Sequence, residues 1–110
     1  MMNKLLSLLG FASKAGALAY GFGAVKESLS GNKAKLVLIA ADISPKSRKE
    51  AAFFADKAKI QNITLESVDI DTLSRAVGCR CGIISVNDNG FAIGCLKALN
   101  EGGTANDQQI

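Results

Sequence analysis

The fold is decided by the stretch Ala34-Lys35-Leu36-Val37-Leu38-Ile39-Ala40-Ala41-Asp42, in which six apolar residues run without interruption between Lys35 and Asp42. A continuous apolar run bounded by charge is typical of a central strand buried on both faces, so we predict a strand over residues 35–42. Ser44-Pro45 follows at once, and a capping hydroxyl before a proline predicts the start of a helix. A buried strand that leads directly into a helix indicates an α/β protein.

Upstream of this strand, the sequence predicts two helices separated by a short strand. Asn3 can cap a first helix over residues 3–14, which carries a broad apolar face and ends before Gly16. Residues 17–20 are a short strand candidate. A second helix begins at a pair of glycines and spans residues 21–29, with apolar side chains three and four residues apart.

Downstream, strands and helices continue to alternate. The predicted elements are a helix over 45–58, a strand over 63–65, a helix over 71–77 closed by Gly78, a strand over 82–86 and a last helix over 89–99 capped by Asp88 or Asn89. Residues 101–110 are polar and are predicted to form a disordered tail. We therefore expect one domain over residues 1–100, a three-layer α/β/α sandwich around a small mixed sheet.

Charge is distributed unevenly along the chain. The formal net charge is +3, but residues 1–49 hold eight Lys/Arg and two acids (+6), whereas residues 50–110 hold five and eight (−3). A basic half can form a one-sided positive face that attracts polyanions such as nucleic acid. The alternative is an ordinary solvated face without a partner.

Cysteine and histidine usage limits the chemistry available. The three cysteines, Cys79, Cys81 and Cys95, are an odd number and predict reduced thiols, with Cys79 and Cys81 small and at least half-buried. The chain has no histidine, so the two closely spaced thiolates lack the further ligands of a zinc site, and we expect no metal and no cofactor.

An enzyme is not expected either. Without histidine, Ser/His and Cys/His nucleophile pairs cannot form. Gly21-Phe22-Gly23 has the first part of a dinucleotide-binding fingerprint, but Lys26 occupies its third glycine position. The acids Glu66, Asp69 and Asp71 gather near a predicted helix start, where we expect them to be solvated and to cap the helix.

The N-terminal run of leucines bears on localisation. Lys4 followed by residues 5–12 has some likeness to a secretory signal, but the run is short, Lys14 follows it, and its spacing fits one helix face. Together with the reduced thiols, this favours a cytoplasmic protein without a membrane span.

RNA is the ligand that the sequence favours most. The amides of a helix start attract phosphate, glycines at 21 and 23 allow a close approach, and Lys26 lies one turn further along. Lys14 precedes the same region. Tyr20 is the one tyrosine and tryptophan is absent, so stacking on aromatic platforms is disfavoured and a structured RNA read by shape is preferred.

Three segments carry a resemblance to a known family. Residues 5–16 (LLSLLGFASKAG), the strand segment 34–42 and residues 73–78 (LSRAVG) resemble the ribosomal protein L7Ae-type family of kink-turn RNA binders. The resemblance spans about residues 3–100 and is greatest to small bacterial members encoded beside ribosomal genes. It implies an α/β/α sandwich that binds kinked RNA with tandem sheared G·A pairs, without catalysis or a cofactor.

The resemblance also implies where RNA would bind. The family motif Gly-x-Asn(or Asp)-Glu-x-x-Lys begins at Gly21 in this chain, and an apolar loop that packs on an extruded nucleotide corresponds to residues 79–81. The residues expected to contact RNA are Lys14, Gly21, Phe22, Gly23, Lys26, Cys79, Arg80 and Cys81.

The chain departs from the motif at three side chains. The Asn position holds Gly23 and the Glu position holds Ala24. The Lys position holds Glu27, with Lys26 displaced by one residue. Backbone amides remain, and these position a nucleic acid without specifying it. Two hypotheses follow: a structured-RNA or ribosome-associated binding protein, or a protein-interaction module of the same fold that has lost kink-turn reading.

Overall fold

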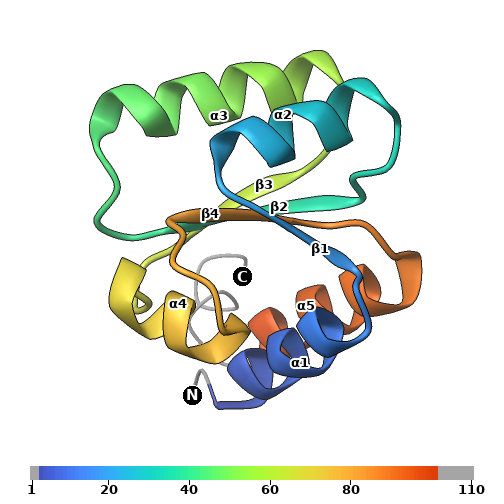
Figure 1. Cartoon of the computed structure of the whole chain (residues 1–110), viewed down its shortest axis with the longest axis vertical. Coiled ribbons are helices and arrows are strands. Elements are labelled where there is room, and N and C mark those ends of the chain that lie inside the picture. The colour runs from blue at the N-terminus through green and yellow to red at the C-terminus, as the bar shows by residue number, and fades with distance from the viewer. Residues whose placement is uncertain (1–2, 102–110) are drawn as a thin grey trace.

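The computed structural model describes residues 3–101, so the predicted tail, apart from Glu101, lies outside the described residues. Figure 1 shows the order of the elements along the chain. They are α1 (Asn3–Lys14), β1 (Leu18–Tyr20), α2 (Phe22–Ser30), β2 (Leu36–Ala40), α3 (Pro45–Lys57), β3 (Asn62–Leu65), α4 (Ile70–Val77), β4 (Ile83–Val86) and α5 (Asn89–Glu101).

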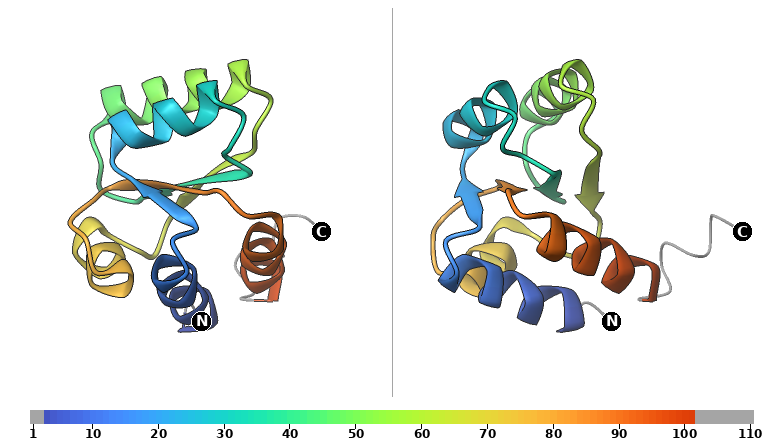
Figure 2. Two further views of the ribbon diagram at one scale, coloured as in Figure 1. Left: turned by 45° about the vertical axis from the view of Figure 1, so that its right-hand side comes forward. Right: turned by 90° about the vertical axis from the view of Figure 1, so that its right-hand side faces the viewer.

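The four strands form one mixed sheet in the order β1-β4-β2-β3. β2 pairs in parallel with β3, and β4 runs antiparallel to both β1 and β2. Helices α2 and α3 cover one face of the sheet, and α1, α4 and α5 cover the other (Figures 1 and 2). The predicted α/β/α sandwich with a small mixed sheet is confirmed.

β2 is the buried centre of the molecule. All five of its residues are buried, and alternate side chains enter two different cores, as the period of a strand requires. Leu36, Leu38 and Ala40 pack in the core beneath α1, α4 and α5. Val37 and Ile39 pack in the core beneath α2 and α3. The strand is shorter than the predicted range 35–42: the N–H of Ala41 already bonds to Val68, outside any strand, and the flanking Lys35 and Asp42 are exposed.

The helix starts follow the predicted chemistry. The backbone N–H of Ser47 donates to Oγ of Ser44 (3.1 Å), and Pro45 occupies the first turn of α3. The carboxylate of Asp88 accepts the backbone N–H of Phe91 (2.9 Å), so it is the cap of α5. Gly78 ends α4 in the left-handed conformation.

The predicted capping role of the acidic group is confirmed at Asp69. Its carboxylate accepts the backbone N–H of Thr72 (2.8 Å) at the start of α4. This backbone hydrogen bond is the main reason why the pKa of Asp69 lies below its ordinary value. Within residues 3–101, no helix is both long enough and apolar enough to cross a membrane.

Candidate nucleic-acid interface

A cleft of about 360 Å³ lies where the starts of α2, α3 and α4 meet the start of β4. It is lined by Gly21, Phe22, Asp42, Ile43, Ser44, Ser47, Ile70, Gly82 and Ile83. Figure 1 shows these helix starts at the same side of the molecule, next to the connection that enters β4. Helix starts present backbone N–H groups and a partial positive charge, so their convergence favours an anionic ligand.

Gly21 determines the shape of the cleft at α2. Its φ of 86° and ψ of 162° belong to a backbone region that is essentially restricted to glycine. The Gly21 N–H donates to the carbonyl of Ile83 (2.9 Å), and its own carbonyl accepts the N–H of Val25 (3.0 Å). The start of α2 is thereby fixed to β4. Glycine has no side chain with which to cap the helix, so the first-turn amides of α2 are left to solvent or a ligand.

The opposite wall of the cleft belongs to the loop between β2 and α3. Asp42 Oδ1 accepts the backbone N–H of Ile70 (2.8 Å), which ties this loop to the start of α4. The first two turns of α3 carry three exposed cations, Lys46, Arg48 and Lys49. A Cβ at Gly82 would lie 2.8 Å from Cγ2 of Ile43, so glycine is needed for this close approach across the cleft.

The loop of residues 79–81 leads directly into the cleft at Gly82. Ser74 fixes this loop, because its Oγ accepts the backbone N–H of Cys81 (3.0 Å) and donates to the Cys81 carbonyl (3.2 Å). Cys81 is buried, and desolvation, with a smaller contribution from Cys79, raises the pKa of its thiol to about 11. The prediction of a buried thiol is correct for Cys81 and wrong for Cys79, which is exposed because it lies in the loop beyond the end of α4.

Arg80 points to solvent and to one acid. Its guanidinium Nη1 lies 2.7 Å from Oδ1 of Asp71 in the first turn of α4, and the two side chains are 73% and 67% exposed. An ion pair this exposed contributes at most about 1 kcal/mol, so Arg80 can exchange this partner for another anion at little cost.

The two predicted lysines lie away from the cleft. Nζ of Lys26 sits over the ring of Phe54, 4.7 Å from its centroid, in a hollow between α2 and α3. Lys14 lines a different hollow, between α1 and α4, together with Arg75 and Gly78. Of the predicted residues, Gly21 and Phe22 line the cleft, the 79–81 loop adjoins it, and Gly23 is exposed in the first turn of α2. The two lysines line other hollows.

Several cleft residues were not predicted from the sequence. Ile43, Ser47, Ile70 and Gly82 come from three segments that only the folded sheet brings together. Ser44-Pro45 marked the start of α3, but the sequence held no signal that this start faces Gly21. Among residues 3–101, no three Cys, Asp or Glu side chains are grouped so that they could hold a metal ion.

Comparison with known proteins identifies relatives of this chain. The model of the ribosomal protein L7Ae/L30e/S12e/Gadd45 family matches residues 3–94. The chain is 29% identical over 96 residues to the large ribosomal subunit protein eL30 of Euphorbia esula, an alignment that covers 87% of this chain and 76% of that protein.

Two solved structures have the same fold. A Bacillus halodurans protein with unknown function superposes with a TM-score of 0.83 at 26% identity, covering 88% of this chain and 97% of that one. The Giardia lamblia 15.5kD RNA binding protein superposes with a TM-score of 0.74, covering 90% of this chain and 84% of that one. Its 17% identity to this chain supports the shared fold alone.

Proposed function

The chain belongs to the ribosomal protein L7Ae/L30e/S12e/Gadd45 family, and we propose that it is an RNA-binding protein that receives structured RNA in the cleft where the starts of α2, α3 and α4 meet the start of β4. The observation that carries the proposal is the start of α2, where Gly21 leaves the first-turn amides without a side-chain cap at the edge of a cleft. Amides in this position hydrogen-bond to phosphate oxygens and benefit from the helix dipole.

The proposed ligand is RNA of the kink-turn type, bound mainly through its backbone and its shape. A sharply bent duplex brings phosphates close together, and the uncapped start of α2 at the edge of the cleft can approach them. Four exposed cations, Arg80 in the loop before β4 and the three at the start of α3, would supply electrostatic attraction. Gly23 and Ala24 have no polar side chains, so fewer side-chain hydrogen bonds to base edges would form than with the full family motif.

We further propose that the protein acts in the cytoplasm, in association with the ribosome or another RNA assembly. The ribosomal association is in keeping with the name of the Euphorbia relative. The role is non-catalytic and uses no cofactor, because the cleft offers amides, hydroxyls and one carboxylate but no nucleophile paired with a base.

The test is a titration of the purified protein into a labelled kink-turn RNA and into a matched duplex whose G·A pairs are replaced by Watson–Crick pairs, at one fixed salt concentration. The proposal expects binding to the kinked RNA to be at least about tenfold tighter, a difference of 1.4 kcal/mol. It also expects affinity to fall steeply as salt rises, because phosphate contacts release counterions. Equal binding to both RNAs, or an affinity that is insensitive to salt, would refute it.

Arg80 offers a sharper version of this test. Arg80→Ala is expected to weaken RNA binding and to lower the slope of log affinity against log salt by about one phosphate contact. Lys97→Gln, which removes an exposed charge from α5, is the matched control and should leave both quantities unchanged. If the two variants lost affinity equally, the 79–81 loop would not face the RNA.

A further inference from the structure

Helices α2 and α3 lead from the proposed RNA cleft to a second hollow at their far ends. Phe22 of α2 and Ser47 of α3, both near the helix starts, line the cleft. The ends of the same helices, with Ser30 and Lys57 among the lining residues, enclose a hollow of about 330 Å³. Both helices lie on one face of the sheet (Figure 2). We call the side chains that continue from the cleft to this hollow the α2–α3 surface; they are Phe22, Lys26, Phe53, Phe54 and Lys57.

Three phenylalanines pack together on the α2–α3 surface. The rings of Phe22 and Phe54 have centroids 6.0 Å apart, and those of Phe53 and Phe54 are 5.3 Å apart. Phe22 lines the cleft and Phe54 lines the second hollow, so the cluster joins the two. The low aromatic content disfavoured a stacking platform, but the fold gathers three of the five phenylalanines at one place. The ring of Phe53 is 60% exposed, and unpaired RNA bases stack on exposed rings of this kind.

Two lysines border the aromatic cluster. Nζ of Lys26 lies 4.7 Å from the centroid of the Phe54 ring, and Lys57 lines the same hollow as these two residues. The attraction between a cation and a ring holds the ammonium of Lys26 at this surface, where its N–H groups can still bind a phosphate. None of the described residues that line the hollow is acidic.

Acids lie beside this surface and lower its positive charge. Helices α2 and α3 together hold five Lys or Arg and three exposed acids, which are Glu27, Glu50 and Asp56. Glu50 lies one helical turn before Phe54 and therefore on the same side of α3. In the cleft, the carboxylate of Asp42 already accepts the N–H of Ile70. The charge of the two helices therefore favours an anionic ligand only weakly, and the continuity with the cleft is the stronger argument for what binds here.

The surroundings of Phe53 fit a nucleic-acid strand better than a helix of a protein partner. The residues one turn before and one turn after Phe53 on α3 are all charged: Lys49, Glu50, Asp56 and Lys57. A helix docks through a continuous apolar stripe, which this side of α3 lacks. A single exposed ring between lysines is the composition of surfaces that bind single-stranded nucleic acid.

We propose that an unpaired strand extending from the bound RNA leaves the cleft along the α2–α3 surface. Lys26 and Lys57 bind its phosphates, and one base stacks on the exposed ring of Phe53. The nine residues of α2 span about 14 Å, the length of about four stacked nucleotides at 3.4 Å each. The proposal rests on the proposed function, because the cleft must hold RNA for a strand to continue from it.

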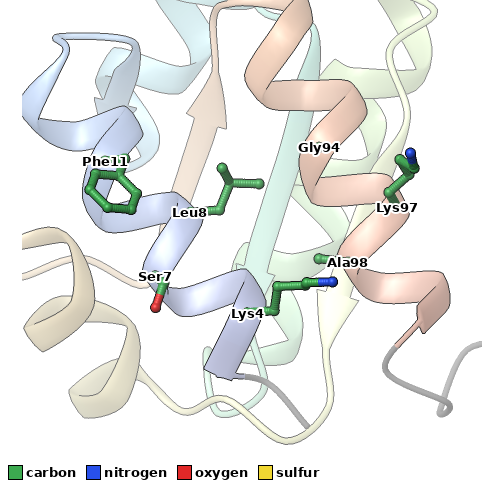
Figure 3. Close-up of a pocket in the computed structure, with 7 residues that line it drawn as sticks. All are labelled: Lys4, Ser7, Leu8, Phe11, Gly94, Lys97 and Ala98. Atoms are coloured by element: carbon green, nitrogen blue, oxygen red, sulfur yellow. The ribbon is translucent and has the colours of Figure 1, made fainter.

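The test compares three RNAs in fluorescence anisotropy titrations with the full chain. They are a blunt-ended kink-turn RNA and two derivatives that carry about four unpaired uridines at one end or at the other. The variants are Phe53→Ala and Lys57→Gln. The matched controls are Phe11→Ala, which removes a ring that is 62% exposed on α1, and Lys97→Gln on α5. Both control residues lie in the helix layer on the other face of the sheet (Figures 1 and 3). Amide NMR spectra establish that each variant is folded.

One of the two extended RNAs is expected to bind at least about fivefold more tightly than the blunt RNA. Phe53→Ala and Lys57→Gln should each remove most of that gain, while their affinity for the blunt RNA stays within about twofold of the parent. The two controls should keep the gain. Glu50→Gln, which removes an acid beside the aromatic cluster, should increase it.

The possible outcomes separate a failure of the strand proposal from a failure of the proposed function. The strand proposal would be overturned if neither extension increased affinity, if the gain survived in either variant, if the controls lost it equally, or if Glu50→Gln reduced it. Binding of the blunt kink-turn RNA would then leave the proposed function intact, and the α2–α3 surface would be free for a protein partner. Loss of the preference for kinked RNA over the Watson–Crick duplex would refute the proposed function, and with it the continuation of the strand.

Discussion

Two helix starts open onto the same cleft and are stabilised in opposite ways. At α3, Ser44 caps the helix through its side chain and Pro45 has no N–H in need of a partner. At α2, Gly21 has no side chain to offer and adopts a conformation that other residues avoid. The start of α3 is therefore satisfied by its own sequence, whereas the start of α2 keeps its amides available for a ligand.

This difference between the two helix starts predicts that different residues determine the stability of the fold and the binding of RNA. A residue that caps α3 should matter for folding and little for RNA, whereas Gly21 should matter for both, because it sets the position of the amides and anchors them to Ile83.

Gly21→Ala should cause the largest change. Apart from its chain neighbours and the backbone of its own helix, no described atom lies within 4 Å of a Cβ at Gly21 or at Gly23, so crowding by other segments contributes nothing at either position. Alanine held at the φ of 86° that Gly21 adopts should nevertheless be strained, which lowers the free energy of unfolding by about 1–3 kcal/mol. A shifted first turn should also weaken RNA binding at least about tenfold.

Gly23→Ala is the control for that variant, because Gly23 lies within α2 at an ordinary φ. It should leave the free energy of unfolding unchanged or raise it by up to about 1 kcal/mol, since alanine is the better helix former. Denaturant unfolding measures both variants. Equal destabilisation by the two would contradict the role assigned to the backbone of Gly21.

Ser44→Ala should have a smaller and more selective effect. Loss of the cap on the N–H of Ser47 should lower the free energy of unfolding by about 1 kcal/mol. RNA affinity, measured at a temperature where the variant is folded, should stay within about twofold of the parent. If affinity fell as far as in Gly21→Ala, the two helix starts would not differ in the way described above.

Asp71→Asn should have the smallest effect. It removes the carboxylate that holds Arg80 at 2.7 Å and leaves the cap residue Asp69 in place. Stability should change by less than about 0.5 kcal/mol, while RNA affinity at low salt should rise by up to about fivefold. Weaker RNA binding by this variant would show that the ion pair assists binding instead of competing with it.

The sequence predicted those features that depend on neighbouring residues. The apolar run around Leu38 identified the central strand, Ser44-Pro45 identified the start of α3, and Gly78 identified the end of α4. Each of these signals operates within a few residues of the chain. Element boundaries were accurate to within one or two residues for the same reason.

Features that depend on distant parts of the chain were not predictable. The strand order, with β4 between β1 and β2, places Gly82 and Ile83 beside Gly21, and no local pattern specifies that order. Lys26 was expected near the RNA because it lies one turn into α2. Its position over the ring of Phe54 was not predictable, because it depends on the packing of α3 beside α2 on one face of the sheet.

An amide NMR titration of the isotope-labelled protein with a kink-turn RNA tests directly whether the start of α2 receives the RNA. We expect the largest shifts at the amides of Phe22 and Gly23 and in the 79–82 loop, whereas the amides of α5 stay unchanged. Shifts concentrated on α1 and α5, or none at the start of α2, would contradict the claim that this helix start receives the RNA backbone.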